Sequence, residues 1–402
     1  MVEKISDNVG YVNKVLDNVS CIVPLEFREF YESVRDADAI ILTGAGRSGG
    51  SLRSAFSEFS KIRYDVDVMT PGDVGFRAAT IYGAAPILEK KYNKIALIAN
   101  SGSGKAESSP YSNTKQLARY IENTGSKKFS INVITSNVDS PLGRIGSKHG
   151  ATLCLKGRDK SSSSENNKDF GIMGDIYELG SLAALQGVCQ MMCEKVPKGS
   201  DGSYYQRFDE IMKDEFPKIG KVMDEFVSSD KYAPIIDNIE SRSYTFMGGR
   251  AVAEEISKML ATRVGHLKHF LGDEVHIVAK ATTPRPRARD LAIFTSYSGG
   301  NPDYPGETED EKASVVEWAK NFNDSGVENF SMVGNKNTKL EGVSKSCFHI
   351  FEEIKPNKPN WFYVKAAYAQ SPIAVSVCER LATKRGLKLS PGVLEWFHSI
   401  AE

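Results

Sequence analysis

The sequence lacks an excess of charge of either sign. Lys plus Arg and Asp plus Glu each number 51 among the 402 residues, so the formal net charge at pH 7 is zero. A protein that binds nucleic acid through its phosphates needs a basic surface, so we expect no nucleic-acid partner. No apolar run approaches the roughly 20 residues of a membrane span, and residues 1–16 are too polar for a secretory signal. We predict a soluble, cytoplasmic protein without membrane contact.

Cysteine is also scarce. The six cysteines lie in apolar contexts of a chain much longer than a disulfide-stapled domain, which indicates reduced thiols in the core. Cys189 and Cys193 are one helical turn apart, but no second pair of Cys or His residues has matching metal-ligand spacing. We therefore predict no disulfide framework and no metal site.

Length and composition indicate a globular protein of more than one domain. Hydrophobic residues make up 41% and charged residues 25% of the chain, which is close to the globular average. A chain of 402 residues exceeds one ordinary core and favours two. We predict a first domain at 1–200, a helical linker at 201–240 and a second domain at 241–402.

One order of strands and helices occurs twice. Apolar runs typical of buried strands alternate with helical patterns in both halves. The strands of the first half are predicted at 37–43, 64–69, 94–100, 130–135 and 151–155, and those of the second at 243–247, 274–279, 290–295, 329–333 and 347–351. Such alternation predicts parallel sheets covered by helices on both faces. The repeat predicts an α/β fold with two such domains in tandem.

A glycine-rich segment, Gly44–Gly50, follows the first strand. Gly46 lets the backbone approach a ligand closely, while Arg47 and Ser48 offer a guanidinium and a hydroxyl to an anion. The alternatives are a turn without a ligand and a dinucleotide site, although the full dinucleotide fingerprint and its acidic partner are missing. The second half carries a shortened version of this segment that ends in Arg250, a second candidate for binding substrate.

Serine-rich turns follow a central strand in each half. Ser101 and Ser103 lie after the strand at 94–100, and Ser296 and Ser298 after the strand at 290–295. Ligands bind beyond the carboxyl ends of parallel strands, where hydroxyls, backbone amides and a helix N-terminus suit a phosphate monoester. A single turn of this kind is often without function, but two at matching positions favour binding. Lys105 lacks the spacing of a nucleotide P-loop.

These turns resemble those of the sugar isomerase (SIS) domain family, whose members bind phosphosugars at a Ser-x-Ser-Gly loop. Residues 44–49 are similar to the first loop of its 6-phospho-3-hexuloisomerase branch, and 173–178 resemble the segment with that branch's proposed catalytic glutamate, here Glu178. The tandem arrangement looks like the isomerase half of glucosamine-6-phosphate synthase and the archaeal phosphoglucose/phosphomannose isomerases. The resemblance implies flavodoxin-like, three-layer SIS domains at about 20–195 and 235–390 and a homodimer.

The resemblance further implies a phosphosugar isomerase that needs no cofactor and interconverts aldose and ketose forms of a hexose or hexulose phosphate. Such a reaction needs a base, groups that polarise the carbonyl and phosphate contacts. We assign proton transfer to Glu178, with a helix-capping carboxylate as the alternative. Arg47 is placed near the phosphate or the developing enediolate, and Ser48 near the phosphate. His266 is a further catalytic candidate, with His269 close by, although single histidines are more often packed or exposed.

Two other functions stay open on the sequence. SIS domains also serve as non-catalytic phosphosugar-binding regulators, although no helix-turn-helix region accompanies this chain. An aminosugar-phosphate deaminase or isomerase would use similar pockets and release or transfer ammonia. In each case the expected partner is a small sugar phosphate.

Overall fold

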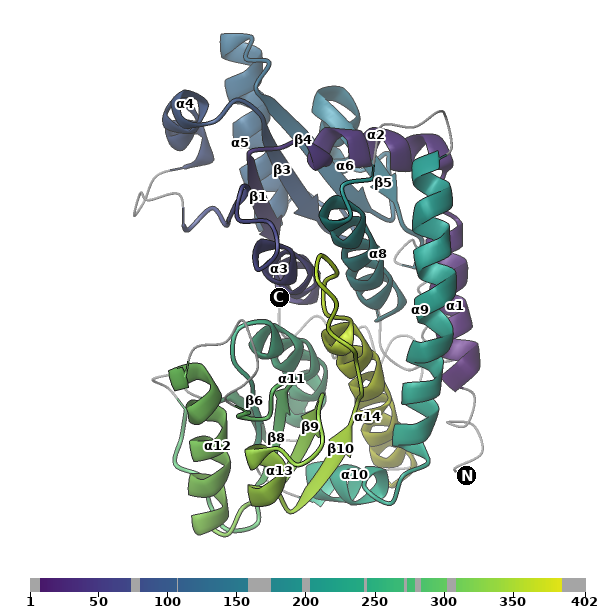
Figure 1. Ribbon diagram of the computed structural model, residues 1–402, viewed down its shortest axis with the longest axis vertical. Coiled ribbons are helices and arrows are strands. Elements are labelled where there is room, and N and C mark those ends of the chain that lie inside the picture. Colours follow the sequence, from purple (N-terminus) through teal and green to yellow (C-terminus); the bar gives the residue numbers. More distant parts are fainter. Residues whose placement is uncertain are drawn as a thin grey trace.

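The protein consists of two parallel sheets of five strands with helices on both faces (Figure 1). The computed structural model describes residues 8–73, 80–106, 108–157, 175–196, 203–241, 244–270, 273–278, 283–301 and 309–384. The first sheet contains β1 (Ala39–Gly44), β2 (Asp67–Met69), β3 (Ile95–Asn100), β4 (Phe129–Thr135) and β5 (Gly150–Cys154). The second contains β6 (Tyr244–Gly248), β7 (Glu274–Ile277), β8 (Leu291–Ser296), β9 (Glu328–Val333) and β10 (Ser346–His349).

Both sheets have the same doubly wound strand order. It is β2-β1-β3-β4-β5 in the first half and β7-β6-β8-β9-β10 in the second, and every pair is parallel. The predicted fold class, two tandem parallel α/β units, is confirmed. The winding reverses between β1 and β3 and between β6 and β8. Ligands of such sheets bind at this switch point, beyond the carboxyl ends of the strands.

The helices follow the predicted alternation. The first half has α1 (Asn8–Ser20), α2 (Pro24–Arg35), α3 (Gly46–Ser60), α4 (Ile81–Lys91), α5 (Ser109–Thr124), α6 (Pro141–His149) and α8 (Asp175–Cys193). The second has α11 (Val252–Phe270), α12 (Glu309–Asp324), α13 (Lys339–Val343) and α14 (Phe362–Lys384). Between them, α9 (Ser203–Val227) and α10 (Tyr232–Ser241) occupy the predicted linker. No helix in the described ranges is long and apolar enough to cross a membrane.

The two halves share one hydrophobic core. Strand residues alternate between faces, so Ile40 of β1 joins a core that also holds Ile293 of β8, whereas Ile41 joins a separate outer core of the first half. A second outer core lies on the far side of the second sheet. In the shared core, α3 packs against α8 and α11, and α14 packs against α11 and α8. Figure 1 shows α9 alongside both halves, in contact with α8 and α14.

Direct contacts between α3 and α11 also join the halves. The Arg53 Nε lies 2.7 Å from a carboxylate oxygen of Glu255 on α11. Gly50 faces Met259, and a Cβ on this glycine would lie 2.9 Å from the Met259 Cγ. The second half therefore fixes the position of α3, which begins at the switch point of the first sheet.

A buried ion cluster holds α9 against α14. The carboxylate of Glu215 is 1% exposed and lies 2.8 Å from Lys358, 3.1 Å from Lys218 and 3.5 Å from Lys365. Burial alone would raise the pKa of Glu215, but the hydrogen bond from Lys358 and the charges of the lysines outweigh it and hold this pKa below 4.5. A carboxylate with a lowered pKa in the folded state stabilises the protein above its unfolded pKa.

We expect acid to weaken this cluster and glutamine at position 215 to remove its pH dependence. The contribution of Glu215 is complete above pH 4.5 and is lost as the pH falls through the lowered folded-state pKa. At pH 7, Glu215→Gln should reduce the free energy of unfolding by about 3 kcal/mol, since it removes the carboxylate charge that faces the buried Lys365 and the partly buried Lys358. Urea unfolding at pH 7 and pH 4 measures both effects. Glu225→Gln on the exposed side of α9 is the control, and equal stability of both variants would contradict the prediction.

Candidate functional site

The glycine-rich segment after β1 is mostly the start of a helix, so the prediction of a loop here was wrong. α3 begins at Gly46, whose φ of +50° lies in the region that favours glycine. Arg47 and Ser48 therefore lie in the first turn of α3. The helix can start this close to the strand because Gly49 has no side chain. A Cβ on Gly49 would lie only 2.6 Å from the Gly44 carbonyl oxygen, so only glycine fits. No side chain caps this turn, and free N–H groups at a helix start favour anions.

Arg47 and Glu178, two predicted catalytic residues, come together in the interior. The Arg47 Nη2 lies 3.7 Å from Glu178 Oε2, and the side chains are 6% and 2% exposed. The hydroxyl of Ser51 lies 3.1 Å from the Arg47 carbonyl oxygen and 3.0 Å from that of Glu178, and so joins α3 to α8. This arrangement places a proton acceptor and a cation side by side near the end of β1.

The first Ser loop, Ser101–Lys105, lies at the end of the adjacent strand β3, with Asn100 paired to Gly44. Its backbone is held against β4: the Ser136 N–H donates to the Gly102 carbonyl at 3.0 Å, and the Gly104 N–H donates to the Ser101 hydroxyl at 3.3 Å. The half-buried Ser103 hydroxyl has no hydrogen-bond partner among the described residues, and neither has the Ser48 hydroxyl. Both hydroxyls are therefore available to a ligand.

The second Ser loop, Ser296–Gly300, has the same backbone design. The Gly299 N–H donates to the Ser296 hydroxyl at 3.1 Å, as Gly104 donates to Ser101 in the first Ser loop. Gly104 and Gly299 have φ angles of +58° and +55°. The carbonyl of each of these glycines also accepts a hydrogen bond from the helix that follows the next strand, α6 or α13. The sequence repeat thus corresponds to a repeated backbone structure that shares these hydrogen bonds.

The two Ser loops differ in access. Ser298 is 0% exposed and its hydroxyl accepts the Gly300 N–H at 3.3 Å, whereas Ser101 and Ser103 are half-buried. Tyr297 stands where the first loop has Gly102, and its hydroxyl donates to the Glu352 carbonyl at 2.6 Å. The first Ser loop is therefore the more accessible of the two predicted binding loops.

The remaining site candidates, Arg250 and His266, belong to the second half. Arg250 follows β6 at the other switch point, with its guanidinium carbon 5.7 Å from the ring centre of Trp318 on α12. His266 lies within α11, and its side chain is outside the described part of the structure. Lys268, two residues later, is fully buried and donates to the Ile239 carbonyl at 2.6 Å. Burial lowers the pKa of Lys268. We regard this lysine as a structural link between α11 and α10.

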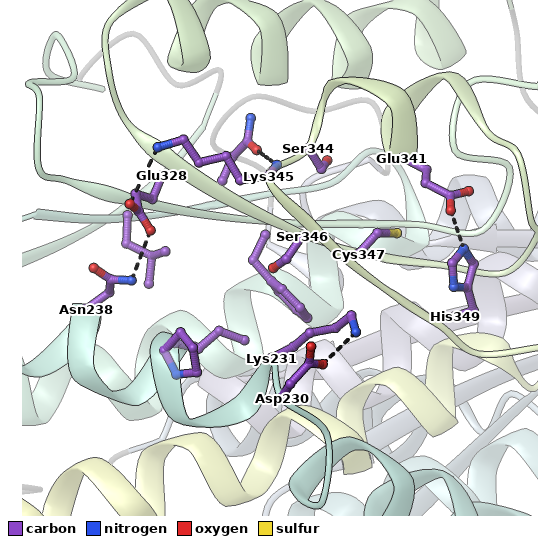
Figure 2. A pocket seen from close by; sticks show the side chains of 15 residues that line it. Asp230, Lys231, Asn238, Glu328, Glu341, Ser344, Lys345, Ser346, Cys347 and His349 are labelled. Atoms are coloured by element: carbon purple, nitrogen blue, oxygen red, sulfur yellow. Dashed lines mark hydrogen bonds and ion pairs between the residues drawn. The ribbon is translucent and has the colours of Figure 1, made fainter.

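A groove of about 620 Å³ opens in the second half, away from these loops. Figure 2 shows it beside the edge strand β10, lined also by residues of α10 and α13, with its charged groups joined in pairs. Lys345 lies 3.4 Å from Glu328, and His349 lies 3.2 Å from Glu341. The groove reaches the amino-terminal ends of β8 and β9, and we do not assign the phosphosugar to it. No grouping of three or more His, Cys, Asp or Glu among the described residues could hold a metal ion.

Comparison with solved structures identifies the fold. No protein-family model and no curated protein matches the sequence. The tagatose-6-phosphate ketose/aldose isomerase of Escherichia coli matches 97% of this chain and 94% of its own, with a TM-score of 0.58 and 10% identity. The C-terminal domain of glucosamine-fructose-6-phosphate aminotransferase from Francisella tularensis matches 97% and 96%, with a TM-score of 0.53 and 12% identity. The chain has the tandem SIS fold. The fold implied by the sequence resemblance is thereby confirmed.

Proposed function

We propose that the protein is a sugar-phosphate isomerase that interconverts the aldose and ketose forms of a hexose or hexulose phosphate at the switch point of its first sheet. The observation that carries this proposal is the buried Arg47–Glu178 pair, 3.7 Å apart, at a switch point where the Ser48 and Ser103 hydroxyls are uncommitted. The structural neighbours include an isomerase of this reaction class and support it. The proposal includes a homodimer in the cytoplasm.

In the proposed reaction, Glu178 accepts the proton from the carbon next to the carbonyl group. The electrons of the broken C–H bond form the enediolate double bond, and negative charge develops on the former carbonyl oxygen. Arg47 stabilises this charge, because a fixed cation in a water-poor site is worth more than in bulk water. Glu178 then returns the proton to the neighbouring carbon, and a proton shifts between the two oxygens. Atoms and electrons balance without an added redox partner.

The phosphate is assigned to the first Ser loop and the start of α3. Ser48, Ser101 and Ser103 supply hydroxyls, and the uncapped first turn of α3 supplies N–H groups. Such contacts fix the sugar so that its reacting carbons face the carboxylate of Glu178, which converts binding energy into orientation.

Turnover and binding measured separately test the proposal. Hexose and hexulose 6-phosphates, their unphosphorylated sugars and glucosamine 6-phosphate are incubated with the protein, and NMR detects isomerisation while an ammonia assay detects deamination. Calorimetry measures the affinity for each compound. Isomerisation of a sugar phosphate alone supports the proposal. Ammonia release would point to a deaminase, binding without turnover to a regulator, and absence of both would contradict a phosphosugar function.

Ser103→Ala should weaken sugar-phosphate binding about 10-fold or more, since a hydrogen bond to a charged group contributes about 1.5–3 kcal/mol. Ser298→Ala is the matched control, because Ser298 has the same position in the second Ser loop but is buried and already accepts the Gly300 N–H. We expect this control to change stability but not affinity. Calorimetric titration of both variants decides the point, and a larger loss of affinity in Ser298→Ala would reverse the assignment of the two loops.

A further inference from the structure

Asn100 occupies the central position of the first switch point. It is the last residue of β3, pairs with Gly44 of β1 and is fully buried. Its Nδ2 donates to the Ser48 carbonyl oxygen at 3.0 Å and to the Ser181 hydroxyl at 3.1 Å. The first contact reaches the opening turn of α3 and the second reaches α8. One amide group thus touches both helices of the candidate site.

Tyr177 completes this network from the residue before Glu178. Its buried hydroxyl lies 2.6 Å from Asn100 Oδ1 and 2.9 Å from the Ile134 carbonyl oxygen of β4. The orientation of the amide is determined by its partners, because a carbonyl such as that of Ser48 only accepts hydrogen bonds and must face the NH₂ group. Both amide hydrogens are therefore committed, and the amide oxygen shares the single Tyr177 hydroxyl hydrogen with the Ile134 carbonyl oxygen.

The network links the groups assigned to the reaction without including them. Asn100 binds the backbone of Ser48, directly after Arg47, while Tyr177 and Ser181 flank Glu178 on α8. A shift of the amide would move α3 relative to α8 and change the 3.7 Å separation of Arg47 and Glu178. Because the interior is close-packed, the neighbouring side chains cannot accommodate such a shift without moving themselves.

We infer that Asn100, supported by the Tyr177 hydroxyl, is a positioning residue that sets the first turn of α3 against α8 for the proposed isomerisation. It does not touch the reacting atoms in this assignment. The inference rests on the proposed function for its catalytic consequence, while the structural coupling from Tyr177 through Asn100 to Arg47 is a property of the fold and can be measured on its own.

The test uses two variants of the full chain and two matched controls. Tyr177→Phe removes one hydroxyl and keeps the ring, and Asn100→Asp removes both donors without changing shape. We expect kcat to fall about 10-fold in Tyr177→Phe and about 100-fold in Asn100→Asp, because small misplacements of reacting groups reduce rates by such factors. KM should stay within about threefold of wild type in both. The controls are Tyr232→Phe, which removes a buried hydroxyl bonded to Ser376, and Asn132→Asp, a buried asparagine of β4. Neither control should change kcat per folded molecule.

The Arg47 Nε–H signal in a ¹H–¹⁵N NMR spectrum, assigned by its loss in Arg47→Lys, gives a readout independent of turnover. The inference requires this signal to move in Tyr177→Phe and to stay in place in Tyr232→Phe. An unmoved signal, or wild-type kcat per folded molecule in both test variants, overturns it. If Asn100→Asp does not fold, Tyr177→Phe alone decides. Wild-type protein without turnover would refute the proposed function, and the Arg47 signal would still decide the coupling.

Discussion

Glu178→Gln is expected to lower kcat by about 10²–10⁴-fold, the range that a positioned general acid–base contributes. Glutamine has the shape of glutamate but cannot accept the substrate proton at neutral pH. The affinity for a sugar phosphate should stay within about threefold of wild type, because the phosphate is assigned to the first Ser loop and the start of α3. Steady-state kinetics and calorimetric titration measure the two quantities.

Stability must be compared in the same experiment, since the carboxylate faces the buried Arg47 at 3.7 Å. Loss of one partner of a buried pair costs about 3–5 kcal/mol at most sites, so activity is expressed per folded molecule. Glu255→Gln is the matched control: the same substitution breaks an Arg–Glu contact of 2.7 Å with Arg53, also on α3. Wild-type kcat in Glu178→Gln, or an equal loss in the control, would remove Glu178 as the base.

Gly104→Ala is expected to destabilise the protein by about 3 kcal/mol and to reduce sugar-phosphate affinity at least 10-fold. The φ of Gly104 is +58°, and a left-handed conformation costs a non-glycine residue roughly 1–2 kcal/mol. The added Cβ would also lie 2.2 Å from the Ser140 Oγ. That oxygen caps α6 by accepting the Gly143 N–H, and loss of such a cap costs about 1 kcal/mol. Relief of the clash must move the first Ser loop or uncap α6.

Gly125→Ala separates the two causes. Gly125 ends α5 with a φ of +67°, and a Cβ added to it would meet no other group within 4 Å. This control carries backbone strain without a clash, so it should cost about 1 kcal/mol and leave affinity unchanged. Urea unfolding and calorimetric titration of both variants provide the comparison. Equal stability, or wild-type affinity in Gly104→Ala, would show that the first Ser loop tolerates a side chain and does not form a close-fitting phosphate site.

The regular elements were predictable where the local pattern was strong. Apolar runs marked the central strands, including Ile95–Asn100 and Leu291–Ser296, because strands buried on both faces must be apolar throughout. The repeated Ser loops were visible because serine and glycine are needed at fixed positions for their hydrogen bonds and positive φ angles. The short helices α4, α6 and α13 were missed, since a few turns between glycines and polar residues carry little periodicity.

The order of the strands, the longer helices and the repeated turns, and with it the tandem α/β fold, could be predicted from the residue pattern, because these follow from contacts between near neighbours along the chain. Which distant residues meet depends on the three-dimensional packing. Arg47 faces Glu178, Asn100 joins α3 to α8, and the inner cores of the two halves merge, because parallel sheets bring together segments remote in sequence. Access was decided there too: the two Ser loops share one motif, yet Tyr297 and the surrounding chain bury the second.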